Sequence, residues 1–334
     1  MKAIVLNQES FEFEVTEVDK PKVEPNEVLI KLKASAINHH ELWSLQDKNI
    51  KSNSDIILGS DGSGIIEQVG SLVNNFKKDD EVILNPSLNW GTSAQVQDEN
   101  YEILGFPTQG TFAEYICLDQ QYIHLKPKHL SFQEAAAIPL GGLTAYRALF
   151  SKGKIESNHK ILITGIGGGA ALFAFNFAKA IGAEIYVTSG TQDKLSKAID
   201  LGAKAGVNYK DKSWETELKN EAKGFDIIID SAAGAGFSHL TDLAKPGGRI
   251  VLFGRTAGNI PHINPKTIFW KQLTIYGSTM GSTEEFKKMI NLIESKEIRP
   301  VIDSIYAPNE INIAFSKMKK TEQFGKIVID LEKF

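Results

Sequence analysis

Cysteine is almost absent from this chain of 334 residues, in which Cys117 is the only one. An intramolecular disulfide is therefore impossible, and nothing in the cysteine usage indicates an oxidising compartment. A zinc site built from several cysteines of one chain is excluded for the same reason.

Long apolar runs and a strong charge of one sign are missing as well. No stretch approaches the roughly 20 apolar residues that a membrane helix needs, and the apolar run that ends at Leu6 is too short for a signal-peptide core. The chain has 37 Lys and Arg against 41 Asp and Glu, a net charge of -4. This small excess gives no electrostatic reason to bind nucleic acid. We therefore expect a cytoplasmic protein with neither a nucleic-acid nor a membrane partner.

What is present is ordinary globular composition, with 42% hydrophobic and 23% charged residues, in a length that suits about two domains. The chain is β-rich to about residue 125. Polar and apolar residues alternate over 27–34, and residues 111–118 alternate with aromatic side chains. Several short strands of this kind predict an antiparallel or barrel-like domain.

Beyond residue 125 the pattern changes to helices and fully apolar strands. Ser131 and Glu134 have the spacing of a capping box that begins a helix. Strands are then predicted over 160–164, 184–188 and 226–230, with helices over 170–181 and 193–201. Continuous apolar strands between helices predict an α/β fold with a doubly wound parallel sheet covered on both faces.

The segment from Asn85 to Gly110 interrupts the β-rich region. Its apolar periodicity disappears, so we expect a long irregular loop. Loops of this length in compact domains are usually functional, or are remnants of a function.

A glycine-rich turn follows the first apolar strand. Gly165, Gly167 and Ala170 fit the G-x-G-x-x-G/A pattern of dinucleotide-binding turns. The first glycine allows the tight turn, the second allows the backbone to approach a pyrophosphate, and the alanine keeps the helix close to the strand. Gly168 and Gly169 lie at the predicted helix start, where N–H groups and the helix dipole favour phosphate. Because a strand precedes the turn and a helix follows it, we interpret it as a dinucleotide site.

The residues after the second strand indicate which nucleotide is bound. A protein that binds the ribose 2′-hydroxyl of NADH usually has an acid there, but this strand ends at Ser189 without one. Lys194 can supply a positive charge, and the hydroxyls of Ser189 and Tyr209 can donate hydrogen bonds to a 2′-phosphate. This predicts NADPH as cofactor. Two alternatives stay open: Asp193 binds a ribose hydroxyl of NADH, or Lys194 is only a solvated helix residue.

Six segments carry a resemblance to a known family. They are 36–42, 59–64, 110–115, 142–146, 165–170 and 324–328. In this order the chain resembles, essentially end to end, the medium-chain dehydrogenase/reductase superfamily, and in particular its zinc-independent, quinone-oxidoreductase-like branch. The resemblance implies a GroES-like catalytic domain of residues 1–125 and 301–334 and a Rossmann NADPH-binding domain of residues 126–300. It also implies a homodimer joined through the strand near Leu273 to Ser278.

The resemblance further implies roles for individual residues. Asn38 would contact the nicotinamide ribose or the substrate, and Glu41 would support that segment. Trp43 would line the acceptor pocket, although plain packing is an alternative for it, and Thr144 would lie beside the nicotinamide. These four are the predicted catalytic residues. The predicted cofactor-binding residues are Asn38, Thr144, Gly165, Gly167, Gly168, Gly169, Ala170, Ser189, Lys194, Tyr209, Phe253, Gly254 and Lys326, the last of which would close over the cofactor.

The zinc ligands of metal-dependent relatives have no counterpart in this sequence. The corresponding segments contain Ser35 with Asn38, Ser60 with Asp61, and Pro139-Leu140-Gly141. No tetrahedral set of thiolates or imidazoles can be assembled from them. His39 and His40, if they lie on a strand, point to opposite faces. Glu41 and Asp61 could be mistaken for a catalytic pair, but the resemblance places Asp61 in the scaffold. We therefore predict no metal site.

These features together favour one function over two others. Without a metal a carbonyl has no Lewis acid to stabilise an alkoxide, whereas a quinone or an enone spreads the charge of an added hydride over its own conjugated system. The protein then has mainly to orient cofactor and acceptor. We expect an NADPH-dependent oxidoreductase that reduces a quinone or an α,β-unsaturated carbonyl. The alternatives are a nucleotide-binding or sensing protein without turnover and a zinc-type alcohol dehydrogenase.

Overall fold

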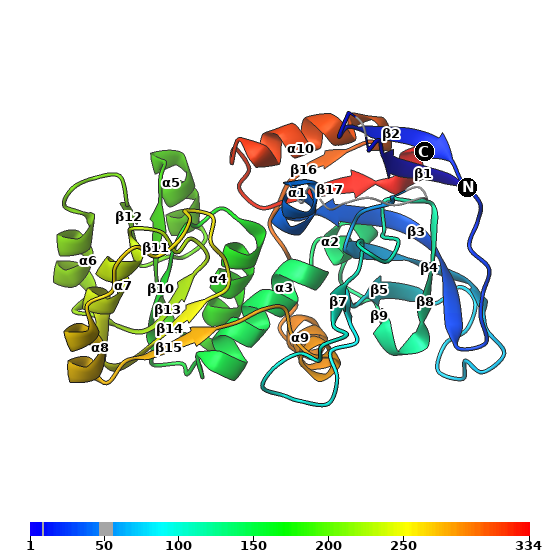
Figure 1. Ribbon diagram of the computed structural model, residues 1–334. Coiled ribbons are helices and arrows are strands. Elements are labelled where there is room, and N and C mark those ends of the chain that lie inside the picture. Colours follow the sequence, from blue (N-terminus) through cyan, green and yellow to red (C-terminus); the bar gives the residue numbers. More distant parts are fainter. Residues whose placement is uncertain (9, 47–55) are drawn as a thin grey trace. The chain divides into compact units, whose positions relative to one another are not determined.

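The computed structural model describes residues 1–8, 10–46 and 56–334 (Figure 1). The chain divides into two compact units, one made of residues 1–143 and 281–334 and the other of residues 144–280. We call them the split unit and the central unit. The boundary between them falls within helix α3 (Pro139–Tyr146). Among the described helices, none has both the length and the apolar character to cross a bilayer.

The split unit is built on a mainly antiparallel sheet. Its strand order is β16-β17-β3-β4-β5-β9, and β8 pairs with β3. The strands are β3 (Glu27–Ile37), β4 (Asp61–Val69), β5 (Glu81–Leu84), β8 (Tyr115–Asp119), β9 (Ile123–Leu125), β16 (Ile302–Tyr306) and β17 (Lys326–Asp330). Strands β1 (Lys2–Leu6) and β2 (Phe13–Glu17) form an antiparallel pair of their own. The alternation over 27–34 puts Val28, Ile30 and Leu32 in the core and leaves Lys31 exposed. The prediction of a β-rich GroES-like domain is confirmed.

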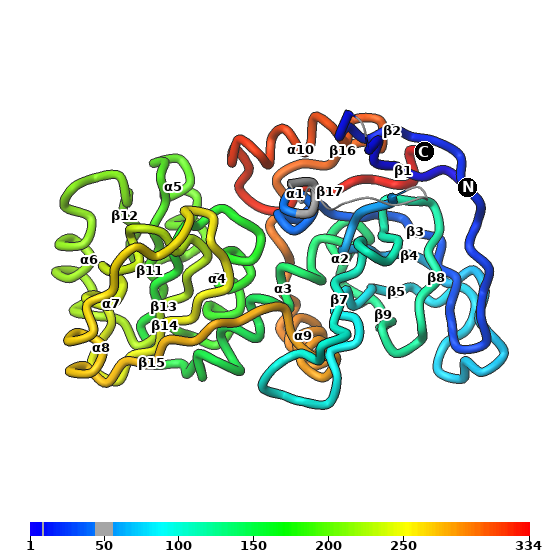
Figure 2. Tube along the Cα trace, in the orientation of Figure 1, coloured from blue at the N-terminus to red at the C-terminus, as the bar shows by residue number. Residues whose placement is uncertain are grey.

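The C-terminal part of the chain returns to the first strands of the split unit. Strand β17 pairs antiparallel with β3, from Ile327 opposite Ile37 to Asp330 opposite Ala34, as the red and blue traces show in Figure 2. The helices of this unit are α1 (His39–Gln46), α2 (Phe132–Ala136), α9 (Thr283–Ser295), α10 (Ile311–Lys319) and the start of α3. This pairing brings Lys326 to the end of β3.

The central unit covers fewer residues than the expected Rossmann range of 126–300, because α2, the start of α3 and α9 lie in the split unit. The capping box of Ser131 and Glu134 is present, as predicted. However, Ala136 and Ala137 pack in a small core with residues of β3 and β17, so α2 belongs to the split unit. The change of periodicity near residue 130 therefore marks a change of secondary structure and not the unit boundary.

The segment from Asn85 to Gly110 is mostly irregular, as expected, apart from the short strands β6 (Ser87–Leu88) and β7 (Glu102–Ile103). Trp90 is 3% exposed. Its ring meets that of Tyr101 edge to face, with centroids 5.3 Å apart, and its Nε1 donates to Ser93 O at 2.9 Å. An aromatic pair thus gives the segment a small core of its own.

The central unit is a six-stranded parallel sheet with order β12-β11-β10-β13-β14-β15 (Figure 1). The strands are β10 (Lys160–Ile163), β11 (Glu184–Ser189), β12 (Ala205–Asn208), β13 (Phe225–Asp230), β14 (Ala244–Leu252) and β15 (Thr274–Gly277). The helices are α4 (Gly169–Ile181), α5 (Gln192–Asp200), α6 (Trp214–Ala222), α7 (Phe237–Leu243) and α8 (Pro265–Lys271). The predicted doubly wound parallel sheet is confirmed.

Both faces of this sheet are covered, as its apolar strands require. Leu162 on β10 packs in a cluster with Leu218 of α6 and Phe237 of α7. Its neighbours Ile161 and Ile163 point to the opposite face and are also fully buried. The strand order reverses between β10 and β13, and such a switch point at the carboxyl ends of the strands is where α/β folds bind ligands.

Candidate functional site

The glycine-rich turn of the central unit lies at this switch point, directly after β10. Gly165 has φ +64° and Gly167 has φ +128°, a region that residues with a Cβ rarely adopt. The N–H of Gly165 donates to Thr188 Oγ1 at 3.1 Å, and the N–H of Ile166 donates to Thr188 O at 2.8 Å. These bonds to Thr188 of β11 hold the turn in a backbone conformation that requires glycine at both positions.

The start of α4 has the features of a phosphate site. In the described part of the chain no side chain caps this helix at Gly168, so its first N–H groups can bind an anion. A Cβ on Gly168 would have no atom within 4 Å. Thr164, the residue before the first glycine, anchors the turn to β13, because its Oγ1 donates to the buried carboxylate of Asp230. These features fit the pyrophosphate of a dinucleotide.

Lys194 extends from α5 to this turn. A Cβ on Gly167 would lie 2.9 Å from Lys194 Cδ and 3.4 Å from its Nζ, so the ammonium lies against the phosphate-binding backbone. Asp193 behaves differently, because its Oδ2 forms an ion pair with Lys197 Nζ at 2.8 Å, one turn along α5. This geometry favours the 2′-phosphate interpretation of Lys194 over the ribose interpretation of Asp193.

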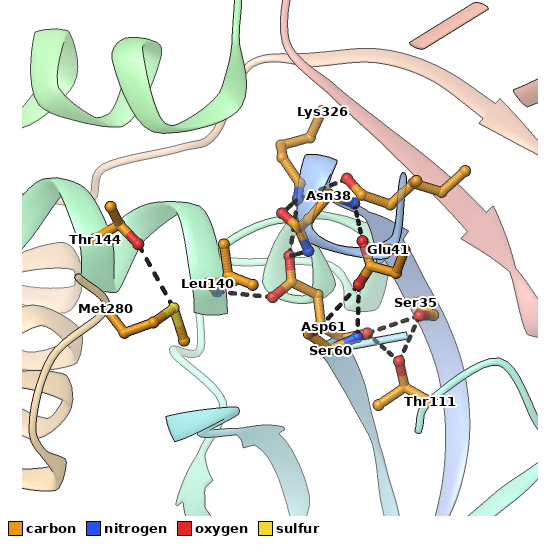
Figure 3. A network of polar contacts seen from close by, with 11 residues as sticks. Ser35, Asn38, Glu41, Ser60, Asp61, Thr111, Leu140, Thr144, Met280 and Lys326 are labelled. Atoms are coloured by element: carbon orange, nitrogen blue, oxygen red, sulfur yellow. Dashed lines mark hydrogen bonds and ion pairs between the residues drawn. The ribbon is translucent and has the colours of Figure 1, made fainter. Parts of the chain in front are cut away.

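The remaining predicted cofactor residues of the central unit lie at the same edge of the sheet or in α3. Tyr209 follows β12, and its N–H donates to Ser189 O at 3.1 Å. Phe253 follows β14, and its N–H donates to Asp230 O at 3.1 Å. A Cβ on Gly254 would lie 2.5 Å from Ser231 O. Thr144, 7% exposed, donates from Oγ1 to Met280 Sδ at 3.6 Å (Figure 3). Their contacts with a cofactor stay predictions.

The predicted residues of the split unit meet in a buried polar network (Figure 3). Lys326, 4% exposed, is its cation. Its Nζ donates to Asp61 Oδ2 at 2.8 Å, to Ile37 O at 3.0 Å and to Asn38 Oδ1. The three N–H groups of the ammonium therefore have three acceptors, and its charge is held inside the unit and not extended outward.

Asp61 joins four elements of the split unit. Its Oδ2 accepts from Asn38 Nδ2 at 3.0 Å besides Lys326, and its Oδ1 accepts from the N–H of Leu140 at 2.7 Å. The start of β4 is thereby tied to the end of β3, to the start of α3 and to β17. A fully buried ion pair is tolerated only with hydrogen bonds of this quality around it.

Glu41 is the second buried carboxylate. Its Oε2 accepts from the N–H of Asn38 at 2.6 Å, and its Oε1 accepts from the N–H and the Oγ of Ser60 at 3.0 and 2.9 Å. Burial, and then the nearby charge of Asp61, raise the pKa of Glu41 to about 7. Both carboxylates are thus bonded to the protein's own donors, which is the arrangement of a scaffold.

Other predicted residues of this unit lie outside the network. Trp43 is 46% exposed on α1, with its ring 6.4 Å from that of His39. His39 and His40 do not lie on a strand, as the sequence suggested, but begin α1, because Asn38 and Glu41 bond at the helix start. Burial lowers the pKa of both histidines.

Sequence reasoning missed the central position of Asp61 and the parts of Ser60 and Leu140. The run Gly59-Ser60-Asp61-Gly62 was a signal for a special site. Its partners could not be read, because the bonds to Leu140 and Lys326 span 79 and 265 positions of the chain.

The donor set of this network does not fit zinc. Asn38, Ser60 and Leu140 offer an amide, a hydroxyl and a backbone N–H, where zinc needs thiolates, imidazoles or carboxylates. The two carboxylates of the network, Asp61 and Glu41, are already bonded to Lys326 and to internal N–H and hydroxyl donors. Throughout residues 1–8, 10–46 and 56–334, no three His, Cys, Asp or Glu residues are placed to hold a metal ion. The residues of the glycine turn, in contrast, fit a pyridine dinucleotide.

Comparison with known proteins gives the family context. The family model "Alcohol dehydrogenase GroES-like domain" matches residues 24–128, and the model "Zinc-binding dehydrogenase" matches residues 169–295. The zinc-type alcohol dehydrogenase-like protein YogA of Leptosphaeria maculans is 34% identical, with 94% of this chain and 93% of the relative covered. The quinone oxidoreductase of Homo sapiens is 30% identical, with 87% and 84% covered.

A solved structure agrees with this context. A crystal structure of an NAD-dependent alcohol dehydrogenase superimposes with a TM-score of 0.92 at 32% identity, and the match covers 99% of this chain and 100% of that one. The relatives thus include proteins named for alcohols and for quinones.

Proposed function

Because this chain belongs to the medium-chain dehydrogenase/reductase superfamily, we propose that it is an NADPH-dependent reductase of quinones or α,β-unsaturated carbonyls that needs no metal ion. It is an oxidoreductase of this family with a pyridine nucleotide as its cofactor. One observation supports the finer assignment: the segments that the family resemblance matches to zinc ligands hold the Asn38 amide, the Ser60 hydroxyl and the Asp61 carboxylate, which is already paired with Lys326.

The acceptor class follows from this donor set. An alcohol or a simple carbonyl needs a Lewis acid or a strong acid to stabilise the charge on its oxygen. A quinone or an enone delocalises the negative charge that a hydride brings. A site that holds an amide and hydroxyls, with its one ammonium saturated by internal acceptors, suits the second class.

The chain's own residues supply binding and orientation. The nicotinamide, when bound, supplies the hydride. The N–H groups at the start of α4 bind the pyrophosphate, and Lys194 binds the 2′-phosphate. Asn38 gives one amide hydrogen to Asp61 and keeps a second, which we assign to an oxygen of the ribose or the acceptor. Two contacts fix the orientation of Asn38: its backbone N–H donates to Glu41, and its Oδ1 accepts from Lys326.

The preference for NADPH rests on the two neighbouring residues of α5. Lys194 lies at the turn, and Asp193 is turned to Lys197. A charge-assisted contact to a 2′-phosphate contributes roughly 1.5–3 kcal/mol, which corresponds to about 10- to 150-fold in affinity.

The test combines turnover with metal content. The purified protein is assayed for NADPH oxidation against a panel of quinones, enones, aldehydes and ketones, before and after chelation, and its zinc content is measured. We expect turnover with quinones or enones at full rate after chelation and less than stoichiometric zinc.

Two other results would each overturn the proposal. Loss of activity on chelation, with recovery on Zn²⁺, would identify a zinc-type alcohol dehydrogenase. Tight NADPH binding without turnover of any acceptor would identify a nucleotide-binding protein that uses the fold without catalysis.

A further inference from the structure

We propose that Lys210 is a second cation for the 2′-phosphate of NADPH and, with Lys194, sets the preference of this chain for NADPH over NADH. The inference rests on the proposed function, because it concerns the cofactor of the same site. It deepens that function by adding a residue that the sequence pattern did not single out.

Gly190 lies close to the residues that follow β12. It is the first residue after β11, and because a glycine has no Cβ, the side chains that follow β12 can approach its backbone. A Cβ there would lie 2.6 Å from Tyr209 Oη and 3.0 Å from Lys210 Cε. The side chains of Tyr209 and Lys210 thus both extend across the end of β11.

The sheet places these residues beside the glycine turn. β12, β11 and β10 are adjacent and parallel, so their carboxyl ends lie at one edge of the sheet. Ser189 is opposite Asn208 in the register, which puts Lys210 two residues beyond the last pair. Lys194 approaches the same edge from α5 and lies at Gly167. Two lysine side chains, one from α5 and one from the turn after β12, therefore approach the end of β11.

The local charges agree with an anionic ligand at this edge. β11 ends at Ser189, and Gly190 and Thr191 follow it, so no acid lies at this position of the sequence. Asp193 is already bound to Lys197. A phosphate with about two negative charges attracts a second lysine as well as the first, and two lysines from separate elements discriminate more strongly against a ribose hydroxyl than one does.

The backbone holds Lys210 in this position. Its N–H donates to Asn208 Oδ1 at 3.1 Å, and the N–H of Asp211 donates to Asn208 O at 3.0 Å. The turn after β12 is thereby closed, and the start of the Lys210 side chain is fixed, although the residue itself is exposed. Less backbone freedom is then lost when a ligand binds.

Binding measurements on the full chain test the inference. Dissociation constants are measured for NADPH, NADH, adenosine 2′,5′-bisphosphate and adenosine 5′-monophosphate at low ionic strength, for the wild type, Lys210→Gln, Lys194→Gln and Lys204→Gln. Lys204 is the matched control, because it is an exposed lysine that precedes β12 at the other end of the strand.

We expect Lys210→Gln to weaken binding of the two 2′-phosphorylated ligands about tenfold and to leave NADH and adenosine 5′-monophosphate unchanged. Lys204→Gln should change none of the four constants. The effect of Lys210→Gln should shrink as salt is added, because the contact is exposed and electrostatic.

The other outcomes separate this inference from the function on which it rests. If Lys194→Gln weakens NADPH binding and Lys210→Gln does not, the inference is wrong and the NADPH assignment stands. If Lys210→Gln weakens NADH as much as NADPH, its role is not in the 2′-phosphate, and the inference is again wrong. If the wild type binds NADH as tightly as NADPH, the cofactor assignment itself fails.

Discussion

The glycine-rich turn of the central unit and the polar network of the split unit differ in how far apart their residues lie along the chain. The turn is complete within residues 164–170, and Gly165 and Gly167 are required by their own backbone angles. The network joins Asn38 to Lys326 across 288 positions. A local site depends on a short stretch of backbone, whereas the network depends on the pairing of three strands.

This difference has consequences for stability and for binding. The network is buried and charged, so damage to it should affect folding of the split unit first. The turn is open at the helix start, so damage to it should affect ligand binding first. The following predictions test that division.

The largest effect is expected at the buried ammonium. Lys326→Met leaves the carboxylate of Asp61 buried without its ion-pair partner, which costs about 3–5 kcal/mol of the free energy of unfolding. Urea denaturation measures this loss. Lys333→Met is the control, because the pair of Lys333 with Asp330 is exposed on the lysine side, and its loss should cost no more than about 1 kcal/mol. Equal losses in both variants would contradict the prediction.

The next effect is a pH dependence from Glu41. Its pKa is about 7 in the folded protein against an ordinary value of 4.5, so between these values the folded state keeps a proton that the unfolded state releases. The free energy of unfolding should therefore fall as pH rises from 4.5 to 7, by up to about 3 kcal/mol from this group.

Comparison with Glu41→Gln over this pH range isolates the effect. The glutamine does not titrate, so the slope of stability against pH should become smaller by that amount. An unchanged slope would show that Glu41 is ionised in the folded protein throughout the range.

A smaller effect, confined to binding, is expected in the turn. Gly167→Ala forces a Cβ onto φ +128° and within 2.9 Å of Lys194 Cδ. We expect the free turn of this variant to relax away from the strained angle, and NADPH binding then has to restore it at a cost of roughly 1–2 kcal/mol, so that the dissociation constant rises about tenfold. Gly168→Ala, where the added methyl meets open space, should stay within about twofold. Similar losses at both positions would remove the special role of Gly167.

The smallest effect concerns a homodimer, which we propose from the edge of the central unit. β15 is the last strand of its sheet, and α8 beside it exposes Trp270 by 78% and Phe269 by 66%. An edge strand can pair with a second copy about a twofold axis. Trp270→Ala should weaken the dimer by about 1 kcal/mol in light scattering, whereas Ile313→Ala on α10 should not. A monomeric wild type at micromolar concentration would exclude the dimer.

Much of the fold could be predicted because it follows from local patterns. The apolar strands of the central unit, such as Ile161 to Ile163, can be stable only between two layers of helices. The capping box of Ser131 and Glu134 needs only four residues. The glycines of the turn were predicted for the same reason.

The unit boundaries and the partners in the network could not be predicted this way. Helix α2 follows a change of periodicity, yet Ala136 packs on β3 and β17 and so belongs to the split unit. The bonds of Lys326 to Asp61 and Asn38 could not be foreseen, and its contact with a cofactor stays a prediction. No periodicity indicates which distant strands will be neighbours.

The sequence by itself therefore determined the two kinds of domain, the dinucleotide turn and the lack of zinc donors, since each depends on residues that are close together in the chain. Only the tertiary structure decided that Asn38 is hydrogen-bonded to the buried ion pair of Asp61 and Lys326 and that Lys210 reaches the end of β11. The physical reason is that strand pairing, which brings β17 to β3 and β12 to β11, sets those distances.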